Sequence, residues 1–304
     1  MHVILLAGGW SDEREVSLSG ARNIAAALER LGHEVRLIDP ALNFQDLMRE
    51  AAKADFAFMN LHGTPGEDGL FQAMLDAAGC PYQGSSPTPS YLALNKAASK
   101  EVFEANDIPT PEWQFISRVH GLAPDLRLDY PVFVKPNKGG SSLGMALVRA
   151  GDRLGPALET IFAMNQSALV ERYIPGMELT CGILDETPLP LIMIRPRNNA
   201  EYFDYDNKYA QNGAEEICPA PVDESVTRMI QEHSLRAHKA LGLTGYSRAD
   251  FILGPDGTPY LLELNTLPGM TATSLLPQAA AQVGYDFDGL IAELIRLGLE
   301  QRGR

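Results

Sequence analysis

Three oxygen-bearing side chains near the end of the chain are spaced in a way that could bind a metal. Asp250 lies in YSRADFIL, and Glu263 and Asn265 lie in YLLELN, on the other side of the turn-rich GPDGTP. Both segments predict strands, in which side chains two positions apart share a face. If the hairpin folds symmetrically about the centre of that turn, Asp250 lies opposite Glu263 and Arg248 lies opposite Asn265, all on one face.

A metal site and a solvated edge strand are both compatible with this face. Facing carboxylates repel each other unless a cation or a proton lies between them. Oxygens from Asp, Glu and Asn suit Mg²⁺, which proteins hold with one or two carboxylates and substrate phosphates. An edge strand with one wet face would show the same alternation. The hairpin alone leaves both interpretations open. Its other face is predicted to be core: Ala249, Phe251, Leu253, Tyr260, Leu262 and Leu264.

Alternating strands and helices precede this hairpin and predict an N-terminal doubly wound parallel sheet. HVILLAGG, HEVRLIDP and DFAFMNLHG are predicted strands, and SLSGARNIAAALERLG predicts a helix with a serine cap. Ligands bind outside the carboxyl ends of such strands, so the loops GGWSDEREVS and LHGTPGEDG share one rim. Glu13 and His62 lie there. Glu13 could equally favour the start of a helix, and His62 could be a core histidine.

A second unit begins near Asn95 and carries groups suited to phosphate. PVFVKPNKGGSSLGMALV predicts a strand, a donor-rich loop whose backbone N–H groups could wrap phosphate oxygens, and another strand. Lys135 lies inside an apolar strand, where an unpaired ammonium is costly, so either an anion is near or the strand is an edge. Lys96 is a second candidate cation. VERYIPGMEL predicts a strand whose polar end could bind a base, with Glu178 reaching ribose hydroxyls.

Composition restricts the kinds of partner. The chain has 304 residues, 45% of them apolar, and a formal net charge of −14, which argues against nucleic acid or an anionic membrane surface as partner. The three cysteines are scattered and suggest neither a disulfide framework nor a zinc site. MHVILLAGG has no basic leader and is too short to span a membrane, so a cytoplasmic location is expected.

Several short stretches together resemble the ATP-grasp superfamily and, within it, the D-alanine–D-alanine ligases. In chain order they are GGWSDEREVSL, LHGTPGEDG, NKAASK, VKPNKGGSSLGM, VERYIPGMELT, FDYDNKY, GYSRADF and LLELNTLPGMT. They cover essentially the whole chain. The resemblance implies an α/β fold with three-domain ATP-grasp architecture, in which an N-terminal doubly wound parallel sheet and two α+β domains enclose the nucleotide. The implied domains are 1–94, 95–178 and 179–304, the last with the metal hairpin and a lid loop.

The resemblance also implies roles for individual residues. Nucleotide binding is implied for Lys96, Lys135, Gly140, Ser142, Met145, Glu171, Arg172, Ile174, Glu178, Lys208 and Leu262. Two Mg²⁺ ions, which Mn²⁺ can replace, are expected on Asp250, Glu263 and Asn265. Substrate binding is implied for Glu13, His62, Arg248, Gly269, Ser274 and Leu275. The residues implied in catalysis are Glu13, Ser141, Tyr209, Arg248, His62 and Gly269.

The implied reaction joins two D-alanine molecules through an acyl phosphate, at the expense of ATP, for peptidoglycan precursor synthesis. DYDNKYAQNGAEEI is the expected lid, and its Tyr209 favours the amine of D-alanine over D-lactate as nucleophile. The alternatives are a D-alanine–D-lactate or D-alanine–D-serine ligase, or another ATP-grasp carboxylate–amine ligase. The expected partners are ATP, D-alanine and a second copy of the chain.

Two other classes fit the sequence less well. A nicotinamide-dependent oxidoreductase would need a G-x-G-x-x-G fingerprint, whereas the first strand ends in only Gly8-Gly9, although Asp39 does follow the second strand. A noncatalytic nucleotide-binding protein would be expected to have lost ligands from the hairpin, which keeps Asp250, Glu263 and Asn265. The ligase interpretation accounts for both halves of the chain.

Overall fold

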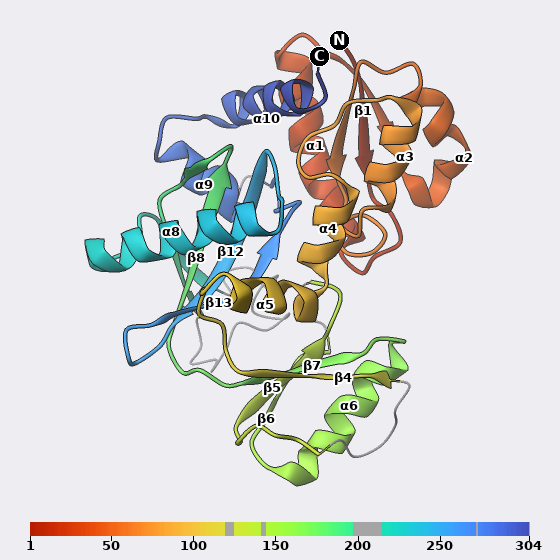
Figure 1. The fold of residues 1–304 in the computed structure, drawn as a ribbon. Coiled ribbons are helices and arrows are strands. Elements are labelled where there is room, and N and C mark those ends of the chain that lie inside the picture. Colours follow the sequence, from red (N-terminus) through yellow and green to blue (C-terminus); the bar gives the residue numbers. More distant parts are fainter. Residues whose placement is uncertain (119–124, 141–143, 197–213, 272, 304) are drawn as a thin grey trace.

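The computed structural model describes residues 1–118, 125–140, 144–196, 214–271 and 273–303 (Figure 1). Within these ranges the chain forms three sheets, each packed against helices. The elements in order are β1 (His2–Ala7), α1 (Arg14–Arg30), β2 (Glu34–Ile38), α2 (Pro40–Ala51), β3 (Phe56–Asn60), α3 (Leu70–Ala78), α4 (Pro87–Leu94), α5 (Lys96–Ala105), β4 (Trp113–Ile116), β5 (Val132–Pro136), β6 (Ala146–Val148), the 3-10 helix η2 (Gly151–Arg153), α6 (Leu154–Ala163), β7 (Ala168–Arg172), β8 (Met177–Leu184), β9 (Thr187–Pro188), β10 (Ile192–Pro196), β11 (Ala214–Ile217), α8 (Glu224–Ala240), β12 (Tyr246–Leu253), β13 (Pro259–Asn265), α9 (Leu275–Ala281) and α10 (Phe287–Gln301).

The first sheet is parallel, with strand order β2-β1-β3, and helices cover both of its faces (Figure 1). This confirms the predicted doubly wound arrangement. Because β1 and β3 are parallel neighbours, the loops that follow them leave the sheet side by side at its carboxyl edge. The two predicted rim loops therefore meet.

The predicted serine cap of the first helix is wrong. Helix α1 begins earlier, at Arg14 with Glu13 at the N-cap, where acidic residues favour the positive end of the helix dipole. Ser17 is instead buried inside the helix, where its Oγ accepts a hydrogen bond from the N–H of Gly8 at 2.8 Å and donates one to the carbonyl of Asn60. The hydroxyl thus connects the ends of β1 and β3.

Asp39 is occupied by structural contacts. Its carboxylate pairs with Arg14 and accepts from the N–H groups of Gly9 and Ala41, each at 3.0 Å, so it caps α2. Burial opposes ionisation, but these donors outweigh it and hold the pKa of Asp39 below its ordinary value. A Cβ on Gly8 would come within 2.7 Å of this carboxylate. These contacts account for Asp39 as a structural residue at the start of α2.

The other two sheets are antiparallel. The four-stranded sheet has the order β4-β7-β5-β6, and the larger sheet has the order β11-β10-β8-β12-β13, with β9 paired to β8. In β5, Val132 and Val134 pack in a small core with α6. The alternate side chains, Phe133 and Lys135, consequently face away from α6.

Two helices pack against a sheet distant from them in sequence. Phe103 of α5 lies in the core of the larger antiparallel sheet with α8, although α5 precedes the four-stranded sheet in the chain. Helix α10, the last element, packs beside α1 against the parallel sheet, and Arg30 pairs with Asp288 across this contact (Figure 1). The predicted domain boundaries at 94 and 178 stay a prediction.

The hairpin of β12 and β13 confirms the predicted pairing of Asp250 with Glu263 and of Arg248 with Asn265. Beyond this point the symmetric register is wrong, because a β-bulge follows Asp250 and Phe251 pairs with Leu261. Leu261, fully buried, takes the core position predicted for Leu262. The bulge adds one residue to β13, which turns Leu262 to the face of Glu263. Tyr260, also predicted as core, bonds through its hydroxyl to Asp256.

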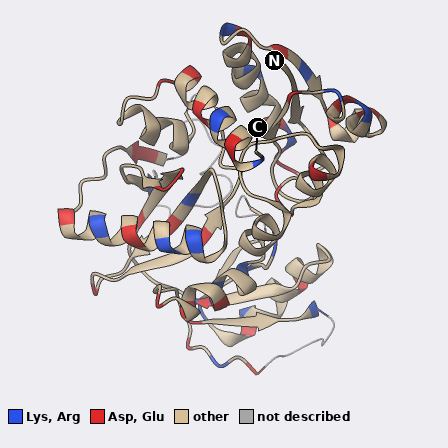
Figure 2. Ribbon diagram, turned by 45° about the horizontal axis from the view of Figure 1, so that its top comes forward, with Lys and Arg blue, Asp and Glu red and all other residues tan. Residues whose placement is uncertain are grey.

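In the described ranges no helix combines the length and the apolar character needed to cross a membrane. Figure 2 shows acidic and basic residues interspersed along the outer helices, as on α8, which carries Glu224, Arg228, Glu232, Arg236 and Lys239. Mixed charges of this kind keep a surface hydrated without creating a single strongly charged face.

The contact between α10 and the parallel sheet can be tested at Gly298. A Cβ there would lie 2.6 Å from the carbonyl oxygen of Tyr82 and 2.8 Å from the ring of Phe56. We expect Gly298→Ala to lower the free energy of unfolding by about 1–3 kcal/mol through overpacking. In the control, Gly155→Ala in the first turn of α6, the Cβ meets no atom beyond its chain neighbours, and a change of less than about 0.5 kcal/mol is expected. Urea unfolding followed by circular dichroism measures both, and equal effects would contradict this packing argument.

Candidate active site

A cavity of about 720 Å³ lies between the two antiparallel sheets and is closed by the rim of the parallel sheet. The four-stranded sheet contributes Phe133, Lys135 and Glu171. The larger sheet contributes Glu178, Ile194, Asp250, Ile252, Leu262 and Glu263. The rim loops contribute Trp10, Ser11, Asp12, Glu13, Gly63 and Thr64. Each of the three sheets therefore supplies part of the wall.

Strand register separates an apolar part of the cavity from an acidic part. Glu178 of β8 is the partner of Ile252 on β12 and of Ile194 on β10. Asp250 lies on β12 two residues before Ile252. Directly opposed residues share a face of an antiparallel pair. A flat apolar group can thus lie against the isoleucines while its polar extension reaches the carboxylates.

The acidic part is built around Asp250. Its carboxylate accepts two hydrogen bonds from Arg248, at 2.8 and 2.7 Å, one from the hydroxyl of Thr180 at 2.7 Å and one from the amide of Asn265 at 3.0 Å. Burial acts to lower the pKa of Arg248, but Asp250 outweighs it and the pKa is raised. Arg248 therefore keeps its charge inside the cavity.

The donor set fits Mg²⁺. Asp250, Glu263 and Asn265 offer oxygens from neighbouring positions of one hairpin face. Within the part of the chain that the structure describes, no three His, Cys, Asp or Glu side chains gather into a complete metal site. Two carboxylates and an amide are the incomplete shell that Mg²⁺ accepts when water and substrate phosphates supply the rest.

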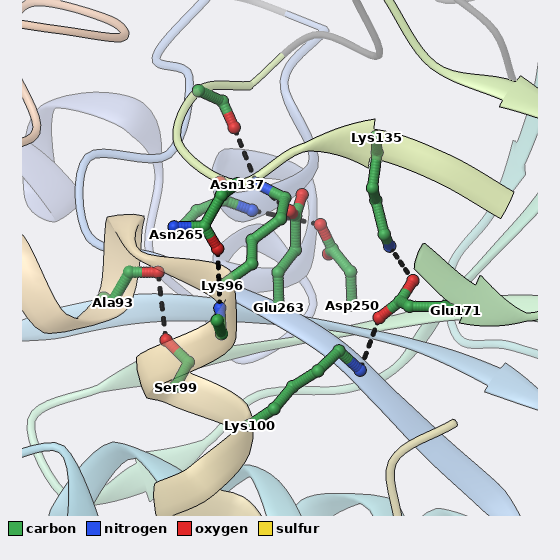
Figure 3. Close-up of polar contacts among 12 residues, drawn as sticks. Ala93, Lys96, Ser99, Lys100, Lys135, Asn137, Glu171, Asp250, Glu263 and Asn265 are labelled. Carbon is green, nitrogen blue, oxygen red and sulfur yellow. Dashed lines mark hydrogen bonds and ion pairs between the residues drawn. The ribbon is translucent and has the colours of Figure 1, made fainter. Parts of the chain in front are cut away.

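Lys96 connects this acidic part to the glycine-rich loop that follows β5, of which residues 137–140 are described. Its ammonium lies 2.8 Å from Glu263 and donates to the carbonyl of Gly139 at 2.6 Å (Figure 3). The side-chain amide of Asn137 donates to Asn95 at 2.8 Å, and its oxygen accepts from the N–H of Ala97 at 2.9 Å. The loop therefore starts from the same helix end that presents Lys96.

The prediction that an anion lies near Lys135 is confirmed: the anion is Glu171, on the neighbouring strand β7. Sequence reasoning missed a second cation, Lys100, which is fully buried and approaches Glu171 from α5 at 2.5 Å (Figure 3). Burial alone would raise the pKa of Glu171, but the two ammonium groups hold it below its ordinary value. Burial also lowers the pKa of Lys100, to about 8.

The rim from the parallel sheet brings further acids to the cavity. Glu13 reaches the glycine-rich loop, since its Oε2 would lie 3.4 Å from a Cβ on Gly140. Glu67, in the predicted loop LHGTPGEDG, is buried and accepts from the N–H of Gly63 at 2.7 Å. His62 is 9% exposed beside Gly63, which lines the cavity.

Most of the predicted site residues in the described ranges line this cavity: Glu13, Lys96, Lys135, Gly140, Met145, Glu171, Arg172, Ile174, Glu178, Arg248, Asp250, Leu262, Glu263 and Leu275. Four others lie near the lining without belonging to it: His62, Asn265, Gly269 and Ser274. Asn265 touches Asp250, and Gly269 and Ser274 belong to the loop before α9, where Ser274 accepts from the N–H of Thr271. Ser141, Ser142, Lys208 and Tyr209 lie outside the described residues, as does most of the predicted lid.

The sequence held signals for some of the missed residues. Lys96 and Lys100 are four residues apart in NKAASK, which places them on the same face of a helix. Phe133 and Lys135 are two positions apart in the strand VFVKP, so they share a face, and both line the cavity. Thr180 had no such signal, because only the pairing of β8 with β12 brings it to Asp250.

Glu67 gives a pH-dependent test of the rim. Burial raises its pKa to about 8 from an ordinary 4.5, and the charge of Glu13 adds to the shift. The folded protein therefore binds this proton more tightly than the unfolded chain does, so the stability it contributes is complete below about pH 4.5 and is lost as pH rises through about 8. In Glu67→Gln the side chain at this position has no ionisable proton. The free energy of unfolding of this variant, relative to wild type, should rise from pH 5 to pH 8 by more than about 1.4 kcal/mol, the equivalent of one pKa unit.

Urea unfolding at pH 5, 6.5 and 8, in EDTA, measures this difference. Glu15→Gln, at an exposed position of α1, is the matched control and should show no such trend. A difference between Glu67→Gln and wild type that is constant with pH would contradict the burial of a protonated carboxyl.

Comparisons with known proteins identify the family of this chain. Residues 102–296 match the family described as D-ala D-ala ligase C-terminus. The D-alanine–D-alanine ligase of Maridesulfovibrio salexigens is 58% identical over 99% of this chain and 100% of its own length. The ATP complex of the Bacillus anthracis D-alanine–D-alanine ligase superposes with a TM-score of 0.88 at 35% identity, covering 100% of this chain and 99% of that one. The D-Ala:D-Ser ligase VanG of Enterococcus faecalis gives 0.83 at 27% identity, over 97% and 98%. With its three-sheet ATP-grasp fold, the chain belongs to the D-alanine–D-alanine ligase family.

Proposed function

We propose that the protein joins two D-alanine molecules into D-alanyl-D-alanine, with conversion of ATP to ADP and phosphate. The observation that carries this is the cavity itself, which gathers a facing pair of carboxylates, Asp250 and Glu263, and two lysines, Lys96 and Lys135, beside an apolar compartment. Phosphoryl transfer from ATP needs positive charge around the phosphates and a separate apolar site for the base. The product serves peptidoglycan precursor synthesis, and we place the reaction in the cytoplasm, where ATP is available.

The nucleotide spans the two parts of the cavity. Its base lies against Phe133 and Ile252, with Glu171 and the backbone of Arg172 and Ile174 at its polar edge, and Glu178 at the ribose. Its phosphates lie toward Lys96 and Lys135. Asp250, Glu263 and Asn265 would hold Mg²⁺, which Mn²⁺ could replace, and a metal bound there would supply positive charge against the phosphates.

The chain positions two D-alanine molecules in sequence. Glu13 holds the ammonium of the first, whose carboxylate oxygen attacks the γ-phosphorus and releases ADP. The amine of the second then attacks the acyl carbon of the resulting acyl phosphate, and phosphate leaves. Arg248, permanently charged, and the N–H of Gly269 stabilise the oxyanion. The second carboxylate is received near Ser274 and Leu275, and the amine proton is taken by His62 or Tyr209, which are the candidate bases.

D-Alanine is favoured over D-serine as the second substrate. A relative 58% identical carries the name D-alanine–D-alanine ligase, whereas the D-Ala:D-Ser ligase is 27% identical. D-Lactate is disfavoured because the resemblance associates a tyrosine at position 209 with an amine nucleophile.

Phosphate release from purified protein tests the reaction. With ATP and Mg²⁺, we expect release only when D-alanine is present, with one D-alanyl-D-alanine formed for each phosphate. L-Alanine and the absence of an amino acid should give none. D-Alanyl-D-lactate or D-alanyl-D-serine as the main product from D-alanine mixed with D-lactate or D-serine would contradict the assigned nucleophile, and no release with D-alanine would contradict the assigned substrate.

The acidic hairpin face is tested by Asp250→Asn and Glu263→Gln, which keep the shape of each side chain and remove its charge. Each should lower D-alanine-dependent phosphate release on the order of 100-fold or more, because charge at the transferring phosphoryl group is then no longer offset. Asp256→Asn, at the exposed tip of the same hairpin, is the control and should stay within about twofold of wild type. Normal activity in Glu263→Gln would contradict the metal site. Activity of the wild type should also vanish in EDTA and return with Mg²⁺ or Mn²⁺.

We further infer a homodimer that uses the outer face of α2. The exposed apolar side chains Leu42, Phe44 and Met48 lie on this helix, and the ring of Phe44 lies 6.0 Å from that of Trp10, which is also half-exposed. Large apolar side chains exposed together on one helix are typical of an interface. Phe44→Glu combined with Met48→Glu should give a monomer by light scattering after size exclusion. Val283→Glu, at an exposed apolar position elsewhere, should not alter the mass, and a monomeric wild type would contradict the dimer.

A further inference from the structure

Lys100 is a buried lysine that does not line the cavity. It is fully buried on α5, and its ammonium lies 2.5 Å from Oε1 of Glu171 and 2.5 Å from the hydroxyl of Thr110. That hydroxyl donates in turn to the carbonyl of Leu261 at 2.7 Å. Lys100 is therefore held from both sides, behind the residue that faces the cavity.

Glu171 divides its two oxygens between two cations. Oε1 faces Lys100 and Oε2 faces Lys135, which comes from the neighbouring strand β5 (Figure 3). Lys135 reaches the cavity, whereas Lys100 approaches from α5 on the other side. Two ammonium groups and one carboxylate leave a surplus of one positive charge, and only Lys135 can present it to a ligand.

Without Lys100 that surplus would not exist. Lys135 and Glu171 would form a closed, neutral pair, and a phosphate could take Lys135 only by leaving a carboxylate buried without a counter-ion, which is strongly unfavourable. With Lys100 in place, Lys135 can turn to a phosphate while Glu171 stays paired. The exchange of Glu171 for a phosphate at Lys135 then costs far less free energy than it would without Lys100.

The charge of Glu171 also affects which base it accepts. Glu171 is directly opposite Phe133 on β5, and both line the cavity. An ionised carboxylate is an acceptor only, so it binds an amino group on the base, as in adenine, and repels the carbonyl oxygen that guanine and hypoxanthine carry in the same place. A protonated Glu171 could donate to that oxygen and would lose the distinction.

We propose that Lys100 is a positioning residue for the nucleotide: as the fixed counter-ion of Glu171 it releases Lys135 for the phosphates and keeps Glu171 an acceptor for a 6-amino purine. This rests on the proposed use of ATP. A purely structural ion pair would instead stabilise the fold without altering nucleotide affinity once the protein is folded.

Calorimetric titration with ATP alone, without D-alanine, tests the proposal in Lys100→Met. We expect the dissociation constant for ATP to rise at least about tenfold and the preference for ATP over inosine triphosphate to fall at least about fivefold. In turnover, KM for ATP should rise by a similar factor while kcat changes less than about threefold. Lys239→Met, which removes an exposed lysine paired with Glu186, is the matched control and should alter none of these values.

Glu171→Gln provides the decisive background. If Lys100 acts through the charge of Glu171, adding Lys100→Met to Glu171→Gln should change ATP affinity less than about twofold. This double variant removes both charges of the Lys100–Glu171 pair and leaves Lys135, which reaches the cavity, as the remaining cation, so it tests the proposal even if Lys100→Met alone does not fold. A tenfold loss in that background as well, or unchanged affinity in folded Lys100→Met, would overturn the proposal. ATP binding that follows these expectations without any D-alanine-dependent phosphate release would remove the proposed function and leave the role of Lys100 intact.

Discussion

Opposite charges paired in the wall of one cavity are the constraint on which this structure depends. Asp250 is held by Arg248, Glu263 by Lys96, and Glu171 by Lys100 and Lys135. Each group would be costly to bury alone, and breaking such a pair from one side commonly costs about 3–5 kcal/mol. Folding therefore has to bring strands from two sheets and the start of α5 to the same place.

The same pairs make the cavity ready for a charged ligand. In each of them a basic side chain faces an acid that lies at the surface of the cavity. A nucleotide and the proposed metal would replace partners one for one: phosphate for carboxylate at the lysines, and cation for cation at the acids. Preformed charges of this kind need little rearrangement during the reaction, which is how protein sites stabilise transferring phosphoryl groups.

The scaffold holds these groups by sharing helices between sheets. Helix α5 packs in the core of the larger antiparallel sheet, yet it presents Lys96 to the glycine-rich loop and Lys100 to the four-stranded sheet. Helix α10 returns the end of the chain to the parallel sheet. Because each sheet depends on elements from another, the three walls of the cavity form one structure.

The sequence by itself determined what depends on local periodicity. The doubly wound order of the first sheet, the pairing of Asp250 with Glu263 in a symmetric hairpin, and the choice for Lys135 between a nearby anion and an edge strand all follow from patterns within a few residues. The tertiary structure alone decided that this anion is Glu171, that Lys100 shares it, and that Thr180 reaches Asp250. It also placed the β-bulge, through which Leu261 takes the core position predicted for Leu262, and it put Ser17 inside α1 and not at its N-cap. The physical reason is one of range. Alternation and helical spacing are properties of a short segment, whereas the partner of a buried charge depends on which distant elements pack together.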